Sequence, residues 1–264
     1  MDCVVLAGGL PGPGPMAELT GGRSRAWLDM GGRVMVERVL DGLQAAQSVD
    51  EIVVVGLAEH EVDALRPRRP VHFLPEQGTM VGNAMAGLLW IQQRAPDAAT
   101  AMLCSMDIPL IRGAAVDHFV ESCRPFDHLF FQAYVTSEVM QAAHPGVRSY
   151  SERWREHGVV YAGDVFVVGM AILATNPEVW EAFERHAWRE YPALEGQVSE
   201  RFGEATWRRL VAGETSDEED FRVILSLLGG EGAMKNVFTP HDCLALDADS
   251  PELVEYLRRR LRGE

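Results

Sequence analysis

Val4-Val5-Leu6-Ala7-Gly8-Gly9, close to the N-terminus, predicts an apolar strand that runs directly into a glycine turn. A second apolar run, residues 102–104, leads into Ser105-Met106-Asp107-Ile108-Pro109-Leu110. A glycine turn brings backbone N–H groups close to phosphates, and an aspartate after a parallel strand can hold the Mg²⁺ that accompanies them. Together, the two features predict a protein that handles a nucleoside triphosphate.

Short apolar runs alternate with amphipathic stretches through the first half of the chain. Strands are expected at residues 3–7, 52–55, 71–74 and 101–104, and helices at residues 34–46, 59–65, 81–94 and 114–122. Apolar strands separated by helices predict a mostly parallel sheet covered on both faces, a three-layer α/β/α Rossmann-like fold. Ligands of such sheets bind beyond the carboxyl ends of the strands.

The second half of the chain is less regular. Residues 129–135 and 159–168 are expected to be strands that include antiparallel edge pairs, and residues 177–228 are mostly helical, with Ser216 and Glu219 as a capping box. The chain is then expected to return to the sheet at 236–238 and 243–246 and to end in a helix at 251–261. No linker separates a second unit, so we expect a single domain of residues 1–264 with a helical insert at about 177–230.

The composition limits the classes of partner that the protein is expected to bind. The 264 residues carry a formal charge of −15, which disfavours general binding to nucleic acid or to anionic lipid. A nucleotide substrate remains compatible, because Mg²⁺ and a few arginines can reverse the field inside one pocket. No apolar run approaches membrane-spanning length and no signal-peptide pattern opens the chain, so we expect a cytoplasmic protein without membrane or nucleic-acid partners.

The four cysteines, Cys3, Cys104, Cys123 and Cys243, form no C-x-x-C pair. Three of them lie in or beside apolar runs, where cysteine behaves as a small core residue. This pattern disfavours a zinc site and a disulfide framework.

Several segments resemble, in the right order, those of one enzyme family. Three N-terminal segments resemble the signature of the MobA-like NTP transferases, which have the nucleotide-diphospho-sugar transferase fold. They are Leu6-Ala7-Gly8-Gly9, then Gly21-Gly22-Arg23-Ser24-Arg25-Ala26-Trp27-Leu28, then Gly31-Gly32-Arg33-Val34-Met35. Asp107-Ile108-Pro109 resembles the family's metal-binding Asp-x-Pro, and Asp247-Ala248-Asp249-Ser250-Pro251-Glu252 resembles its C-terminal segment. The resemblance implies Mg²⁺-dependent transfer of NMP from an NTP to a phosphorylated acceptor, a sugar phosphate or a cofactor precursor, with release of pyrophosphate. A homodimer is a further expectation.

The resemblance also implies roles for individual residues. Arg25 and Asp107 are expected to be catalytic, and Asp107 is expected to bind the metal with Asp249 or Asp247. The nucleotide is expected to contact Leu6, Ala7, Gly8, Gly9, Leu10, Gln77, Gly78, Thr79 and Asn83, the last four at the base. Arg148 and Asp164 are expected to face the acceptor.

The chain departs from the family pattern in two places. Ser24-Arg25 stands where the family has Pro-Lys, and arginine keeps the charge but offers a planar fork in place of a point charge. The glycine turn is followed by residues 10–15, whose three prolines lack N–H donors. We therefore expect the phosphate-facing N–H groups at Gly8, Gly9 and Leu10 and near Gly21-Gly22.

Alternatives remain for single residues and for the whole chain. Asp107 also suits a turn, Asp249 a helix start, Thr79 an N-cap, and Arg148 a solvated surface. A molybdenum-cofactor guanylyl- or cytidylyltransferase, or a methylerythritol-phosphate cytidylyltransferase, would share the fold and differ in base and acceptor. Because Arg25 stands where the family has a lysine, a catalytically silent nucleotide-binding protein is a further alternative.

Overall fold

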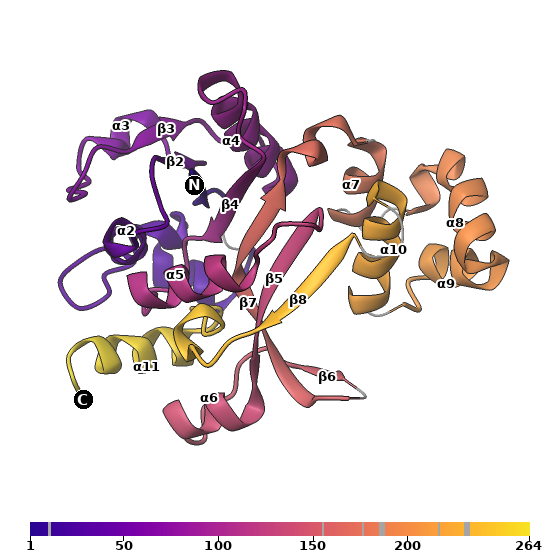
Figure 1. The fold of residues 1–264 in the computed structure, drawn as a ribbon. Helices are drawn as coiled ribbons and strands as arrows, with labels where there is room; N and C mark the ends of the chain where they lie inside the picture. Colours follow the sequence, from indigo (N-terminus) through magenta and orange to yellow (C-terminus); the bar gives the residue numbers. More distant parts are fainter. Residues whose placement is uncertain (10–11, 155, 176, 185–187, 216, 230–232) are drawn as a thin grey trace.

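The computed structural model describes residues 1–9, 12–154, 156–175, 177–184, 188–215, 217–229 and 233–264. Their strands form an eight-stranded sheet in the order β3-β2-β1-β4-β7-β5-β8, with β6 paired to β7 (Figure 1). The strands are β1 (Cys3–Leu6), β2 (Ile52–Val55), β3 (His72–Leu74), β4 (Thr100–Ser105), β5 (Phe130–Thr136), β6 (Glu152–Trp154), β7 (Gly158–Gly169) and β8 (Met234–Phe238). The first four strands in sheet order are parallel, whereas β7 runs antiparallel to β4 and β5. The mostly parallel α/β sheet is confirmed.

The helices expected in the first half are also present, each within a few residues of its predicted bounds. They are α2 (Met35–Ala45), α3 (Glu59–Val62), α4 (Met80–Arg94) and α5 (Gly113–Ser122). The final helix, α11 (Pro251–Leu261), has the predicted bounds, and Ser250 caps it by accepting from the Leu253 N–H.

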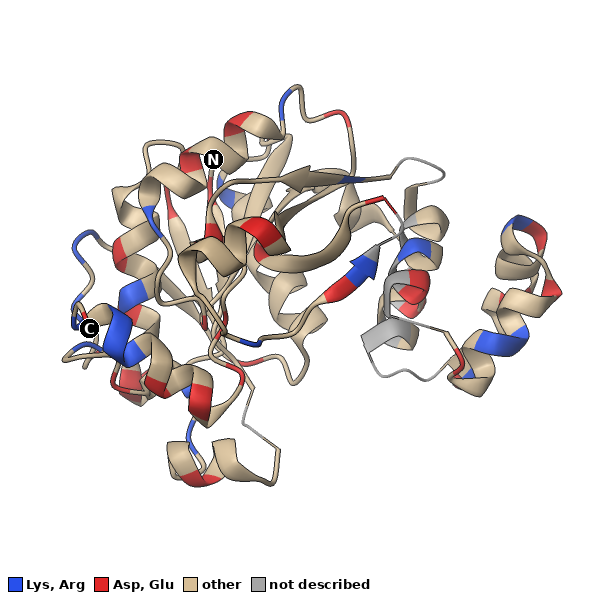
Figure 2. Ribbon diagram, turned by 90° about the horizontal axis from the view of Figure 1, so that it is seen from below, with Lys and Arg blue, Asp and Glu red and all other residues tan. Residues whose placement is uncertain are grey.

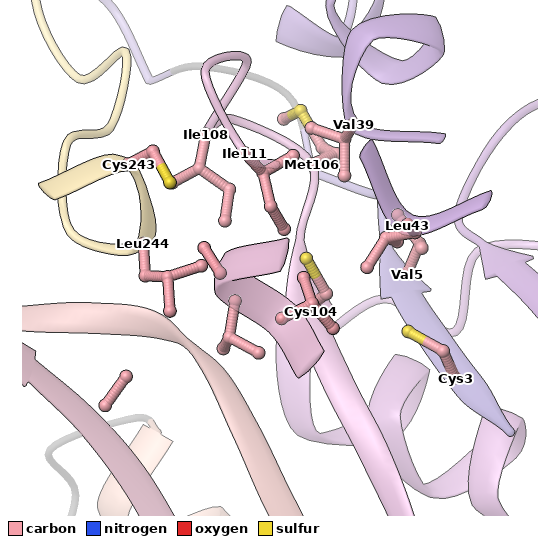
Figure 3. Packing of buried hydrophobic residues seen from close by; sticks show 14 of the residues in the cluster. Cys3, Val5, Val39, Leu43, Cys104, Met106, Ile108, Ile111, Cys243 and Leu244 are labelled. Carbon is pink, nitrogen blue, oxygen red and sulfur yellow. The ribbon is translucent and has the colours of Figure 1, made fainter. Parts of the chain in front are cut away.

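Successive side chains of β1 point to opposite faces of the sheet. Val5 packs with the apolar stripes of α2 and α5, whereas Val4 packs with α4 on the other face. Figure 3 shows Val5 and Cys104 of the sheet with Val39 and Leu43 of α2. The sheet therefore lies between two helical layers. All four cysteines are buried and free, as core residues would be.

The helical part of the second half gathers at one end of the molecule (Figure 1). It contains α7 (Pro177–Glu184), α8 (Glu195–Phe202), α9 (Glu204–Ala212) and α10 (Asp217–Gly229). These helices bury Trp188 and Val198 in the same apolar cluster as Leu88 of α4. Ser216 lies outside the described residues, so the predicted capping box does too.

One predicted strand is wrong. Residues 243–246 were expected in the sheet, but the chain forms a 3-10 helix there, η5 (Asp242–Leu244). Its turn is closed by the Leu244 N–H to the His241 carbonyl and the Ala245 N–H to the Asp242 carbonyl. Cys243 and Leu244 are fully buried against Ile108 and Ile111 (Figure 3). The apolar run therefore reflects a buried crossing over the sheet end and not a strand.

Several short elements were not expected, among them α1 (Pro15–Thr20), α6 (Ser137–Ala143) and β6. Helix α1 begins at Pro15 inside the proline-rich stretch, where proline suits the first helical position. Figure 2 shows acidic residues spread over many elements of the ribbon and basic residues near the C-terminus, where the last turn of α11 carries Arg258–Arg260. In the described part of the chain, no helix has the length and apolar character needed to cross a bilayer.

Candidate functional site

The predicted catalytic residues lie beyond the carboxyl ends of β1 and β4. Asp107 lies two residues after the end of β4, and Asp164 lies on the neighbouring strand β7, where Val165 pairs with Cys104 of β4. Asp247 and Asp249 come from the segment between η5 and α11, and the Ala248 N–H donates to the Asp107 carbonyl at 2.9 Å. Backbone pairing thus brings four aspartates from three separate parts of the chain to one end of the sheet.

Arg25 lies among these carboxylates. It opens a short 3-10 helix, η1 (Arg25–Trp27), which Ser24 caps by accepting from the Ala26 N–H. The Ser24 hydroxyl also donates to the Ala7 carbonyl at 3.1 Å, which ties η1 to the end of β1. Arg25 Nη2 lies 3.0 Å from Asp107 Oδ2, and Arg25 Nη1 lies 2.5 Å from Asp249 Oδ1. One guanidinium therefore bridges two of the predicted metal ligands.

Both oxygens of Asp107 have partners. Its side chain is only 6% exposed, and the Ser105 hydroxyl donates to Oδ1 while Oδ2 faces Arg25. These two contacts fix the orientation of the carboxylate.

The cluster carries more negative charge than Arg25 neutralises. Burial, then the charge of Asp249, raises the pKa of Asp247 to about 7. Burial, then Asp107, raises the pKa of Asp164 well above its usual range. Asp247 Oδ1 is buried without a hydrogen-bond partner among the described residues. The carboxylates of this cluster therefore act on one another, and one buried carboxylate oxygen is left without a partner among the described residues.

The donor set suits Mg²⁺, because carboxylate oxygens are the ligands that hard divalent cations prefer. The arrangement as it stands does not hold an ion: among the described residues, no three His, Cys, Asp or Glu side chains are grouped closely enough. Arg25 occupies the space between Asp107 and Asp249. The chemistry of the donor set therefore fits a magnesium ion, and the two oxygens nearest Arg25 are held by its guanidinium in this arrangement.

The glycine turn contacts a residue that the sequence did not single out, Glu76. Its carboxylate accepts from the Gly9 N–H at 2.9 Å, the Gly78 N–H at 3.1 Å and Asn83 Nδ2 at 2.7 Å. A Cβ on Gly8 would lie 1.8 Å from Glu76 Oε2, so the carboxylate fills the space beside the turn. The available signal was position, because Glu76 follows β3 at the same end of the sheet as Gly8.

The predicted base-binding segment is tightly organised. Thr79 is the N-cap of α4 and accepts from the Gly82 N–H at 2.9 Å. Asn83 is 3% exposed, and its Oδ1 accepts from the Gln77 N–H at 2.8 Å. Because Asn83 Nδ2 is also engaged with Glu76, its amide orders the 76–78 turn from within. Met80, which was not predicted, is 58% exposed at the start of α4.

The predicted phosphate donors near Gly21-Gly22 are already engaged. The Gly21 N–H donates to the Glu18 carbonyl and the Gly22 N–H to the Ala17 carbonyl, where they cap α1. Helix α1 was not expected, which is why these donors were assigned to phosphate. The Ala7 N–H donates to Val55 and the Leu6 carbonyl accepts from Met106, both within the sheet end. Leu10 lies outside the described residues.

The two residues predicted to face the acceptor, Asp164 and Arg148, lie in different places. Asp164 belongs to the aspartate cluster, where the charges of Asp107, Asp247 and Asp249 act on it. Arg148 is exposed between α6 and β6. None of the contacts between described side chains ties Arg148 to the cluster.

Residues 3–201 match the family model of the MobA-like NTP transferase domain. Among solved structures, the chain is similar to a hypothetical transferase from Thermus thermophilus, with 25% identity, a TM-score of 0.68 and coverage of 96% of this chain and 98% of that one. Two others share the fold. One is 4-diphosphocytidyl-2C-methyl-D-erythritol synthase from Anaerococcus prevotii (11% identity, TM-score 0.57, coverage 99% and 95%). The other is a CMP:2-keto-3-deoxy-manno-octonic acid synthetase complexed with CTP (12%, 0.55, 99% and 98%). No curated protein matches the chain.

Proposed function

Since the chain belongs to the MobA-like NTP transferase family, we propose that it transfers a nucleoside monophosphate from an NTP to a phosphorylated small molecule and releases pyrophosphate. The observation that carries the proposal is the placement of Arg25, Asp107, Asp247 and Asp249 together beyond β1 and β4, beside the Gly8-Gly9 turn. This is the end of a parallel sheet at which nucleotides bind.

In the proposed reaction, an oxygen of the acceptor phosphate forms a bond to the α-phosphorus while the bond from that phosphorus to the pyrophosphate oxygen breaks. The chain needs no side-chain nucleophile, because positioning and charge neutralisation carry phosphoryl-type transfer. Mg²⁺, when bound, supplies charge neutralisation at the phosphates. Asp107 with Asp249 or Asp247 would hold it, and Arg25 would face the developing charge. The Gly9 N–H would join Arg25 there only after release from the Glu76 carboxylate.

Base and acceptor are open within this proposal. The similar structures include a synthetase complexed with CTP, and a cytidylyltransferase is one of the same-fold options. A thermal-shift panel of the four NTPs with Mg²⁺ would identify the base, and sugar phosphates and nucleotide-free cofactor precursors would then be tested as acceptors.

The central test is Asp107→Asn, which keeps the side-chain shape and removes its charge. We expect pyrophosphate release to fall by about a hundredfold or more, because a charged group at the reacting phosphates is lost. The matched control is Asp97→Asn, at an exposed carboxylate in the loop after α4, which should keep the wild-type rate. An unchanged rate in a folded Asp107→Asn protein would refute the assignment. NTP binding without turnover in the wild type, with every acceptor tried, would favour the silent nucleotide-binding alternative.

A further inference from the structure

The Arg25 guanidinium occupies the point at which the two predicted metal ligands converge. It lies 3.0 Å from Asp107 Oδ2 and 2.5 Å from Asp249 Oδ1. The Arg25 side chain is 28% exposed, Asp107 6% and Asp249 51%, so the bridge lies at the mouth of the cluster and not inside it. The arginine side chain can therefore leave without passing through the core.

A divalent cation cannot share these two oxygens with Arg25. An ion bound to both would lie within about 2.1 Å of each oxygen, in the space that the guanidinium fills. Two cations in direct contact would also repel each other strongly in a partly buried site. Occupation of the Asp107–Asp249 pair by Arg25 and by metal is thus mutually exclusive.

The charge balance favours exchange when a metal is supplied. With Arg25 in place, Asp247 Oδ1 is still buried without a hydrogen-bond partner among the described residues. A doubly charged ion would compensate the carboxylates of Asp107 and Asp249 more fully than one guanidinium does. The released arginine would stay beside the glycine turn, because Ser24 ties η1 to the Ala7 carbonyl.

We propose that Arg25 is a placeholder for the divalent cation: in the free protein it holds Asp107 and Asp249 together, and metal binding displaces it toward the phosphates. The inference deepens the proposed function and rests on it for the identity of the metal ligands. Arg25 is then a positioning residue in the metal-free protein. A lysine would hold the two carboxylates less well, because an ammonium lacks the planar fork of a guanidinium.

The test is direct binding of Mn²⁺, without nucleotide, followed by the electron paramagnetic resonance signal of the free ion. Arg25→Gln should bind Mn²⁺ about tenfold more tightly than the wild type, because the competing cation is gone. The matched control is Arg23→Gln, which removes the same charge two residues away, where Arg23 pairs with Glu61 at 2.7 Å. This control should bind Mn²⁺ within about twofold of the wild type, since only long-range charge changes.

Two further variants complete the test. The double variant Arg25→Gln/Asp107→Asn should lose the gain, because one of the shared ligands is removed. Arg25→Lys should bind with intermediate affinity, and it carries the test if Arg25→Gln does not fold by circular dichroism. Equal affinities of the wild type and the folded Arg25 variant, or an equal gain in Arg23→Gln, would overturn the proposal.

The outcome is separate from that of the transferase assay. Tighter Mn²⁺ binding in the Arg25 variant without any nucleotidyl transfer would leave the exchange standing and reject the reaction. Transfer activity with unchanged Mn²⁺ binding would do the reverse.

Discussion

Gly8 and Gly56 show how little space the chain leaves around the glycine turn. A Cβ on Gly56 would lie 2.3 Å from the Gly8 Cα, and Gly56 has a φ of +108°, which side chains rarely adopt. A Cβ on Gly8 would meet the Glu76 carboxylate, which three N–H donors hold in place. Both glycines are therefore required by close approach of backbone and carboxylate.

Gly8→Ala should destabilise the protein by about 1–3 kcal/mol, because Glu76 must abandon its donors. Gly56→Ala should cost more, since its obstacle is backbone and its φ is unfavourable. The measurement is urea unfolding. Gly196→Ala in α8 is the control: no atom lies within 4 Å of the added Cβ, so stability should rise slightly. Equal stabilities of Gly8→Ala and the wild type would show that Glu76 is not held as described.

Arg25 also has a compositional context. Lys235 is the only lysine in the chain, so arginine supplies nearly all of its basic side chains. An arginine at this position, where the resemblance implies a lysine, therefore follows the general usage of the chain. It is weak support for the silent nucleotide-binding alternative.

At the scale of elements, a buried polar network connects α6, η5 and α11. His144, 1% exposed at the end of α6, places Nε2 2.8 Å from Asp242 Oδ2 and Nδ1 2.8 Å from the Tyr256 hydroxyl. Arg112 pairs with the other Asp242 oxygen at 3.0 Å. Because η5 leads into Asp247, the network positions the C-terminal part of the aspartate cluster.

The pH dependence of stability should report this network. The hydrogen bond from His144, then Arg112, lowers the pKa of Asp242 from 3.8 to about 2. The unfolded chain binds a proton first, so the stabilisation is complete above pH 3.8 and is lost as the pH falls toward 2. The loss amounts to roughly 2 kcal/mol.

Urea unfolding between pH 5 and 2.5 measures this loss. Asp242→Asn should be less stable than the wild type at pH 5, and the difference should shrink as the pH falls. Asp97→Asn, at an exposed carboxylate, should follow the wild type throughout. A difference between Asp242→Asn and the wild type that stays constant with pH would contradict the assignment.

At the scale of the whole molecule, the helices of the second half share an apolar cluster with the sheet. Trp188 is 1% exposed and packs edge-on against Trp207 at 6.5 Å, in the cluster that includes Val4 and Leu88. That residues 1–264 form one domain stays a prediction, and this shared apolar cluster offers a way to test it.

Trp188→Ala should therefore destabilise the whole protein by about 3–5 kcal/mol. Trp188→Phe should cost much less, because its ring keeps the packing and the Trp188 Nε1 that it removes has no hydrogen-bond partner among the described residues. Far-UV circular dichroism and tryptophan fluorescence should report one coincident unfolding transition. Two separated transitions would show that the helical region is an independent domain.

Local pattern was enough for the first half of the fold. The apolar runs at β1, β2 and β4 predict strands, and the apolar stripe of α2 has the spacing of a helix. Parallel strands then place Gly8 and Asp107 at the same end of the sheet. The hydrophobic pattern gave a wrong prediction where buried apolar residues do not belong to a strand. Residues 243–246 are as apolar as a strand, yet residues 243 and 244 belong to η5, and α1 begins at Pro15, in a proline-rich stretch where no helix was expected.

The sequence alone determined the mostly parallel α/β sheet, because its elements depend on residue types and on periods of two and 3.6. The family followed from the resemblance of several motifs in the right order, and the sheet end at which the site is predicted followed from the strand ends that carry them. Only the tertiary structure decided which charges meet. Arg25 and Asp249 are 224 residues apart in the chain, and Gly9 and Glu76 are 67 apart. Such contacts arise from the order and register of the strands, which no local pattern contains. For this reason the expected phosphate ligand, Arg25, was found bridging the expected metal ligands.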